Sequence, residues 1–123
     1  MSIDRLSTFA LDKILSGQVS EQATCVVKFY SNDCHYCHAL AEYYKEIAED
    51  EDLSDVYFFA FNVNDNPSIE KRLKFNGVPT ISVIQTTAGA KKSKVKIMPD
   101  PDSPNEKTWY YAKDIKKFIE REK

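Results

Sequence analysis

Cysteine, glycine and tryptophan are scarce in this chain of 123 residues, which contains three cysteines, three glycines and one tryptophan. Three cysteines are too few for a disulfide scaffold, and an odd number leaves one of them over. Long hydrophobic runs are missing as well. The longest, from Val56 to Phe61, has six residues, whereas a helix that spans a membrane needs about 18 or more. These absences argue against a small disulfide-rich protein and against a transmembrane protein, so we expect no membrane partner.

An excess of charge of one sign is also missing, because 17 basic and 19 acidic residues give a net charge of −2. Proteins that bind nucleic acids neutralise phosphates with lysine and arginine, so we expect no nucleic-acid partner. The first twenty residues include the charged residues Asp4, Arg5, Asp12 and Lys13. Charges at these positions are not compatible with the hydrophobic region of a secretory signal, which favours a cytoplasmic protein.

The composition, with 42% apolar and 29% charged residues, is typical of a soluble globular protein. A chain of this length can bury one hydrophobic core and has the size of one domain. Three of the five prolines lie between Pro99 and Pro104, which predicts an exposed loop. No repeat and no linker divides the rest. We therefore expect a single domain over residues 1–123 that acts as a monomer.

The hydrophobic pattern predicts an alternation of helices and strands. Apolar residues at helical spacing predict helices over residues 6–15, 34–49, 66–75 and from about 109 onward. β-Branched and aromatic runs predict strands over residues 24–30, 56–63, 79–85 and 94–98, the last two joined by a turn at Ala88–Gly89. Strands separated by helices imply right-handed crossovers and parallel pairing. We therefore expect an α/β fold, in which a central mixed sheet ends in an antiparallel hairpin and has helices on both faces.

The same pattern makes predictions for individual side chains. Phe9 is expected on the inward face of the first helix, and Tyr111 on the inward face of the last. Tyr43 and Tyr44 are expected to pack the second helix. The third helix is expected to start with Asn66-Pro67 and to end at Asn76-Gly77, where a left-handed backbone is easy for glycine.

The two cysteines of Cys34-His35-Tyr36-Cys37 lie three residues apart at the start of the second predicted helix. Ser31-Asn32-Asp33, directly before them, are residue types that favour a helix N-cap. Unpaired backbone amides and the helix dipole in the first turn favour a thiolate at Cys34. Cys37, one turn further along, is expected to be more buried and less ionised. This asymmetry permits a two-step exchange in which Cys34 attacks a substrate disulfide and Cys37 resolves the mixed disulfide.

Three stretches of the chain carry a resemblance to a known family. They are Val26–Tyr30 leading into Cys34–Cys37, then Phe61–Pro67, and then Asn76–Thr80. Over about residues 20–120, their order and spacing resemble the thioredoxin-like family, which includes thioredoxins and domains of the protein disulfide isomerase type. The resemblance implies a thioredoxin fold and an enzyme of the protein-disulfide oxidoreductase class.

The resemblance also implies partners and a substrate site. The substrates would be protein disulfides or dithiols, and the electrons would come from a reductase or from glutathione. No bound organic cofactor is expected, because the redox-active disulfide Cys34–Cys37 itself carries the electrons. The resemblance further implies that Pro79 is a cis-proline beside the cysteines, and that the backbone of Val78 offers strand-like hydrogen bonds to a substrate.

Two positions depart from the family pattern. Family members commonly have a tryptophan directly before the first cysteine, where this chain has Asp33. They also usually carry a buried acid six residues before that cysteine, where this chain has Lys28. A lysine near Cys37 would favour a thiolate, whereas an aspartate beside Cys34 would oppose it. Both residues are therefore candidate redox-tuning groups, and their net effect on the thiols is open.

His35, Tyr36 and His38 are further candidates for redox tuning. A histidine inside the motif resembles the more oxidising relatives, and a tyrosine before the second cysteine resembles glutaredoxins. Any group that stabilises the Cys34 thiolate stabilises the reduced form and raises the redox potential. We therefore hypothesise a potential above that of ordinary thioredoxins. For His38 the alternative is a solvated residue of the first helical turn.

Three alternatives to an oxidoreductase use the same residues. Cys34–His38 also fits the CxxCH pattern of covalent haem attachment, which requires export and usually a second axial ligand. A structural zinc site usually needs two separated ligand pairs, but the only other cysteine, Cys25, is expected to be a buried apolar residue in a strand. No metal is therefore expected. The third alternative is a non-catalytic thioredoxin-fold module that binds a partner through the same groove.

Overall fold

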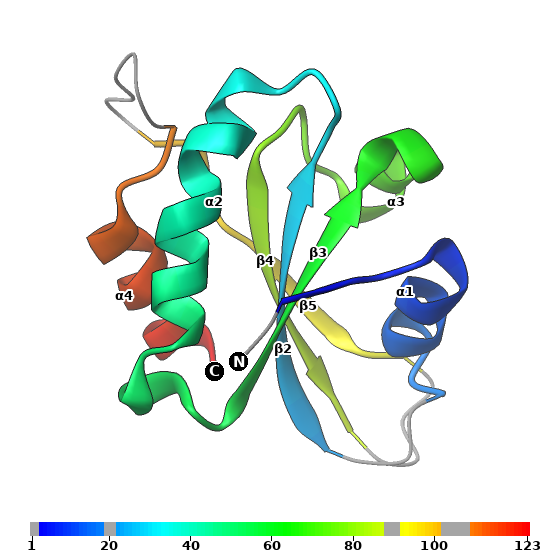
Figure 1. The fold of residues 1–123 in the computed structure, drawn as a ribbon. Coiled ribbons are helices and arrows are strands. Elements are labelled where there is room, and N and C mark those ends of the chain that lie inside the picture. Colours follow the sequence, from blue (N-terminus) through cyan, green and yellow to red (C-terminus); the bar gives the residue numbers. More distant parts are fainter. Residues whose placement is uncertain (1–2, 19–21, 88–91, 102–108) are drawn as a thin grey trace.

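The computed structural model describes residues 3–18, 22–87, 92–101 and 109–123, and places a five-stranded sheet between two layers of helices (Figure 1). In chain order the elements are β1 (Asp4–Arg5), α1 (Thr8–Leu15), β2 (Ala23–Tyr30), α2 (His35–Ala48), β3 (Val56–Asn62), α3 (Ile69–Leu73), β4 (Thr80–Thr86), β5 (Lys94–Ile97) and α4 (Ala112–Glu122). Short 3₁₀ helices, Glu51–Leu53 and Val63–Asp65, follow α2 and β3. None of the helices in these ranges is both long and apolar enough to cross a membrane.

The sheet has the strand order β1-β3-β2-β4-β5. β1 and β2 run parallel to β3, whereas β4 is antiparallel to both β2 and β5. Figure 1 shows α2 and α4 on one face of the sheet and α1 and α3 on the other. The expected α/β fold is therefore confirmed. The hydrophobic pattern does not predict β1, because two residues are too few to show a period. The expected turn at Ala88–Gly89 and the end of the proline-rich loop at Pro104 lie outside the described residues.

β2 is the central strand, and both of its faces are buried. Val26 packs in the apolar layer beneath α2 and α4, and Val27 packs in the layer beneath α1 and α3. This double burial explains why the strand shows little alternation of apolar and polar residues. Because β2 and β3 are parallel, their carboxyl ends reach the same edge of the sheet, and the segment after β2 leads directly into α2.

Tyr44 ties α2 to the sheet. Its side chain is fully buried, and its hydroxyl lies within hydrogen-bonding distance of the carbonyl oxygens of Val26 (3.1 Å) and Phe59 (2.6 Å). Burial raises the pKa of the Tyr44 phenol, so the group remains a donor. Tyr43 is 42% exposed, and its expected packing role is wrong, because neighbouring residues on a helix point about 100° apart.

Two further expected inward positions are wrong. Phe9 is 70% exposed, because Leu6, which defined the expected apolar face, precedes the N-cap Ser7 and does not belong to α1. Tyr111 is 37% exposed because α4 begins one residue later than this position. Tyr110 is buried in its place and joins the layer beneath α2 and α4.

The third helix is shorter than expected, and its left-handed end is a lysine. α3 begins after Ser68 and ends at Lys74, which has a φ of 61° and lies in the left-handed region. Gly77 also has a positive φ, 85°, but it lies in the loop toward β4. Because the left-handed region is unfavourable for residues other than glycine, the sequence carries no signal for such an end at Lys74.

Candidate active site

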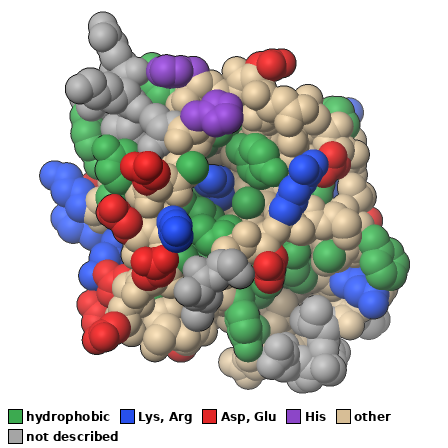
Figure 2. Space-filling view, viewed as in Figure 1, with side chains coloured by type: hydrophobic (Ala, Val, Ile, Leu, Met, Phe, Trp, Pro, Cys, Tyr) green, Lys and Arg blue, Asp and Glu red, His purple; other side chains and the backbone are tan. Residues whose placement is uncertain are grey.

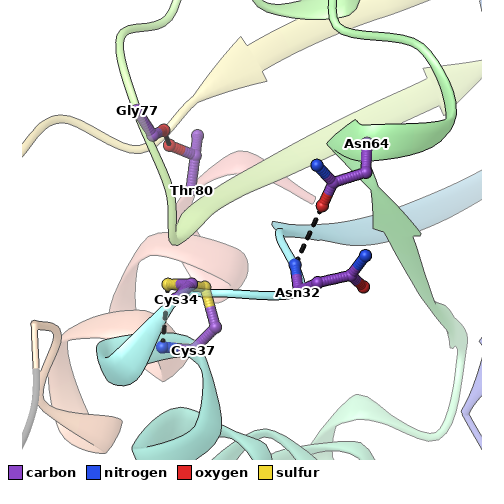
Figure 3. Close-up of a disulfide and its surroundings, with 6 residues drawn as sticks. All are labelled: Asn32, Cys34, Cys37, Asn64, Gly77 and Thr80. Carbon is purple, nitrogen blue, oxygen red and sulfur yellow. Dashed lines mark hydrogen bonds between the residues drawn. A yellow bond between two sulfur atoms is a disulfide. The ribbon is translucent and has the colours of Figure 1, made fainter.

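Cys34 and Cys37 are joined by a disulfide at the N-terminus of α2 (Figure 3). Cys34 is the N-cap residue, and its Sγ accepts a hydrogen bond from the backbone N–H of Cys37 at 3.1 Å. The two Cα atoms are 5.2 Å apart, a usual separation for a disulfide. One helical turn is therefore enough to bring the two sulfur atoms together.

Both cysteine side chains are nearly buried, with 8% of Cys34 and 5% of Cys37 exposed. The N-cap position places Cys34 Sγ at backbone amides that have no partner within the helix, and such amides stabilise negative charge. A thiolate formed at Cys34 after reduction would retain a charge-assisted hydrogen bond from the Cys37 amide. The arrangement can therefore hold a reduced pair with its negative charge on Cys34.

Three asparagines connect the loop before Cys34 to the end of β3. Asn62 Nδ2 donates a hydrogen bond to Asn32 Oδ1 (2.8 Å), and the backbone N–H of Asn64 donates to Asn62 Oδ1 (2.9 Å). The backbone N–H of Asn32 donates to Asn64 Oδ1 at 2.9 Å, as Figure 3 shows. The sequence alone suggests Asn32 only as a capping residue. The expected parallel pairing of strands could have indicated this contact, because polar residues that follow two neighbouring parallel strands meet at one edge of a sheet.

The loop before β4 reaches the same end of the sheet. Thr80 Oγ1 donates a hydrogen bond to the Gly77 carbonyl (2.8 Å), and the Gly77 N–H donates to Glu70 Oε2 (3.1 Å). In Figure 3 the turn between Gly77 and Thr80 points toward the disulfide. Within this turn the Val78–Pro79 peptide bond is cis, with Pro79 buried and Val78 half-buried. Val78 and Pro79, which the family resemblance indicates for substrate binding, thus lie in a loop with a hydrogen bond at each end.

Aromatic rings lie beside the cysteines on the exposed side. The ring centroids of His35 and Tyr36 are 5.7 Å apart, and those of Tyr36 and Trp109 are 5.5 Å apart. His35, His38 and Asp33 are exposed, and Figure 2 shows the two histidines (purple) at one end of the molecule. The contact with Trp109 has no signal in the sequence, because it joins segments that are distant along the chain.

Lys28 is buried in β2, with only 9% of its surface exposed. Its Nζ lies 5.1 Å from the ring centroid of Tyr44 and 5.6 Å from that of Tyr30. Burial lowers the pKa of the Lys28 ammonium, because removal from water disfavours the charged form. Lys28 and Cys37 line the same pocket, of which Asp33 is not part. The structure therefore places Lys28, but not Asp33, in the pocket beside Cys37.

Within the part of the chain that the structure describes, no three His, Cys, Asp or Glu side chains form a group that could hold a metal ion. Cys25 is 5% exposed in the middle of β2 and packs in the layer beneath α1 and α3. α2, which carries Cys37, covers the opposite face of the sheet. The expectation that Cys25 is a small buried residue is confirmed.

Comparisons with known proteins agree with this geometry. A family model described as Thioredoxin matches residues 8–100, which is most of the chain. A search by sequence among curated proteins finds no match.

Several solved structures share the fold. A chloroplastic thioredoxin z is 23% identical with a TM-score of 0.67, and the match covers 98% of this chain and 94% of that one. The Trx4 domain of ERdj5 is 16% identical with a TM-score of 0.72, with coverage of 98% and 95%. Malassezia sympodialis thioredoxin is 14% identical with a TM-score of 0.66, with coverage of 98% and 90%. At these identities the structures indicate the fold alone.

Proposed function

Because the chain belongs to the thioredoxin family, we propose that it exchanges disulfides with protein substrates through Cys34 and Cys37. The observation that carries the proposal is the disulfide between the N-cap residue of α2 and the cysteine one turn further along. The family and this cysteine pair support thiol–disulfide oxidoreductase chemistry in general. Protein disulfides as substrates, and the roles of individual residues, are the finer part of the proposal.

The reduced pair would transfer two electrons to a substrate in two steps. The Cys34 thiolate attacks one sulfur of the substrate disulfide, which forms a Cys34–substrate disulfide and releases the other substrate sulfur as a thiolate. Cys37 loses its proton and attacks Cys34 Sγ. This attack breaks the mixed disulfide, forms the Cys34–Cys37 disulfide and releases the second substrate sulfur as a thiolate, which takes up a proton from solvent. The substrate is reduced by two electrons and the cysteine pair is oxidised by two.

Two neighbouring segments support binding of an extended substrate chain. The loop with Val78 and Pro79 is held by the hydrogen bonds of Thr80 and Gly77, and the Val78 backbone is our candidate for pairing with the substrate. Tyr36, within the motif, and Trp109 form an aromatic contact that offers apolar surface beside the cysteines.

The cysteine pair needs no organic cofactor in this proposal, since the electrons pass through its sulfur atoms. A reductase or glutathione returns two electrons to the disulfide after each turnover. The direction of net exchange follows from the potential of the pair relative to that of the thiol pool, and a potential change of about 30 mV shifts the equilibrium constant tenfold.

A redox titration tests the proposal. The purified protein is equilibrated in glutathione buffers of graded ratio, free thiols are trapped by alkylation, and intact masses are recorded. We expect one reversible step of two thiols that maps to Cys34 and Cys37, together with catalysed reduction of a disulfide-bonded protein. Absence of a two-thiol step would overturn the proposal. A reversible step without turnover would favour the alternative of a partner-binding module.

A further inference from the structure

An open pocket of about 550 Å³ lies beside Cys37, a size typical of small-molecule sites. One wall is formed by residues of α2, namely Cys37, His38, Ala41 and Lys45. The opposite wall comes from the N-terminal segment and from β2 and β3, and includes Ile3, Arg5, Lys28, Tyr30 and Ala60. Figure 2 shows basic side chains (blue) beside hydrophobic ones (green) in the middle of this face of the molecule, with acidic side chains (red) nearby.

The described charged side chains that line the pocket are all basic. Arg5, Lys28, Lys45 and His38 line it, and no acidic residue of the described chain does so. Arg5 is partly neutralised, because its guanidinium forms an ion pair with Asp65 at 2.8 Å. Lys45 takes part in none of the ion pairs formed by described residues. The lining of the pocket therefore carries an excess of basic side chains, which an anion would complement.

Lys28 is the one buried residue among the described basic side chains that line this pocket. More than nine-tenths of its surface is buried, yet no described carboxylate forms an ion pair or hydrogen bond with its Nζ. Its near neighbours are the ring faces of Tyr30 and Tyr44, which compensate for only part of the lost hydration. A buried charge without a counter-charge is unfavourable. An anion that enters the pocket would supply this missing counter-charge.

The rest of the lining is mostly apolar, although it includes the uncharged polar residues Ser31 and Asn32. Ile3, Ala41 and Ala60 offer hydrocarbon surface, and Tyr30 adds an aromatic ring. Such a surface gains nothing from a small hydrated ion but gains from an apolar group that displaces water. We propose that this pocket binds a small amphiphilic carboxylate, with its anionic head at Lys28 and its apolar body against Ile3, Ala41 and Ala60. The ligand would lie next to Cys37, and the proposal does not depend on turnover by the cysteine pair.

Octanoate is a suitable probe, and the oxidised full chain is the protein to use. We expect one-to-one binding in calorimetry, with NMR shifts at the backbone amides of His38 and Lys45 in the α2 wall. 1-Octanol has a similar chain but no charge, and inorganic phosphate has charge but no chain. Each of these two probes should bind at least about tenfold more weakly than octanoate. Octanol binding as tightly as octanoate would overturn the role of charge, and equal binding of phosphate would overturn the role of the apolar body.

Variants locate the site. Lys28→Met removes the cation at similar length and should weaken octanoate binding about tenfold or more. Lys117→Met, on the exposed face of α4, removes a charge outside the pocket and should leave binding unchanged. Ala41→Phe fills the pocket from an exposed position and should likewise weaken octanoate binding about tenfold or more. This variant tests the site even if Lys28→Met does not fold. Octanoate binding of wild-type strength in a folded Lys28→Met or Ala41→Phe variant would show that this pocket is not the site.

Discussion

Cys25 and Cys34 are buried to a similar extent but lie in regions with opposite chemistry. Cys25 is 5% exposed in the middle of β2, aligned with Tyr57 of β3 and Ile84 of β4. Cys34 is 8% exposed at the N-cap of α2, where its sulfur accepts a backbone hydrogen bond. An apolar layer opposes a thiolate, whereas a helix N-terminus favours one. The difference teaches that position relative to a helix end, rather than burial, distinguishes Cys34, the nucleophile of our proposal, from Cys25.

Replacing each cysteine in turn is the strongest test of this comparison. Cys34→Ser should reduce the rate of reduction of a disulfide-bonded protein by on the order of 10³-fold or more, because the serine hydroxyl is not ionised. The matched variant Cys25→Ala should retain the rate and lose about 1 kcal/mol in the free energy of unfolding. A large loss of rate in a folded Cys25→Ala variant would contradict the comparison.

The contact of Tyr44 with the middle of the sheet should influence the free energy of unfolding without influencing the rate of disulfide exchange. Tyr44→Phe leaves the buried carbonyls of Val26 and Phe59 without their donor and should lower the free energy of unfolding by about 1–3 kcal/mol. Urea denaturation measures this loss. Tyr43→Phe, at the exposed neighbour, is the control and should have no effect. If Tyr44→Phe slowed disulfide exchange at full stability, the separation between the two regions would be wrong.

A substitution inside the motif should change the redox potential, and its effect should be smaller than that of removing Cys34. His35 is the first residue of α2, where proline is tolerated, so His35→Pro removes the imidazole and keeps the helix. We expect the potential to fall by about 30 mV, which is a factor of ten in the equilibrium constant. Titration against glutathione measures it, and His38→Ala tests whether a histidine one turn away acts similarly. An unchanged or higher potential in His35→Pro refutes the tuning hypothesis.

The smallest expected effect concerns pH and the buried Lys28. Because burial lowers the pKa of its ammonium below the ordinary 10.5, the unfolded chain holds more protons than the folded one between these two values. Stability must therefore rise with pH within that window. The difference in unfolding free energy between wild type and Lys28→Met, measured at neutral and alkaline pH, should move in favour of the wild type as pH rises. A movement in the opposite direction would mean that folding stabilises the charged form.

Features encoded by neighbouring residues could be predicted from the sequence. The unbroken apolar run of β2 indicates a strand buried on both faces, and the two cysteines at the start of α2 indicate the redox pair. Both depend on local spacing and on residue type. The left-handed Lys74 could not be predicted, because the surrounding structure imposes a backbone that its residue type disfavours.

Features that depend on contacts between distant segments could not be predicted. Asn32 and Asn64 meet only because β2 and β3 are parallel neighbours, and Tyr36 meets Trp109 only after the chain has folded. Lys28 departs from the family pattern, and the sequence therefore marks it as a candidate. Its pocket, with Arg5 and Lys45, is lined by α2, the N-terminal segment, β2 and β3, which come together only when the chain packs. A single sequence contains no signal for that packing.

The two edges of the sheet have a consequence for concentrated solutions of the protein. β1 is only two residues long, and β5, at the other edge, alternates the exposed Lys94 and Lys96 with Val95 and Ile97. A second molecule that added its own β5 to this edge would bring lysines together, and like charges repel. Short and charged edges are a common protection of β-sheets against intermolecular strand pairing. Pairing of folded molecules through the edges of the sheet is therefore disfavoured.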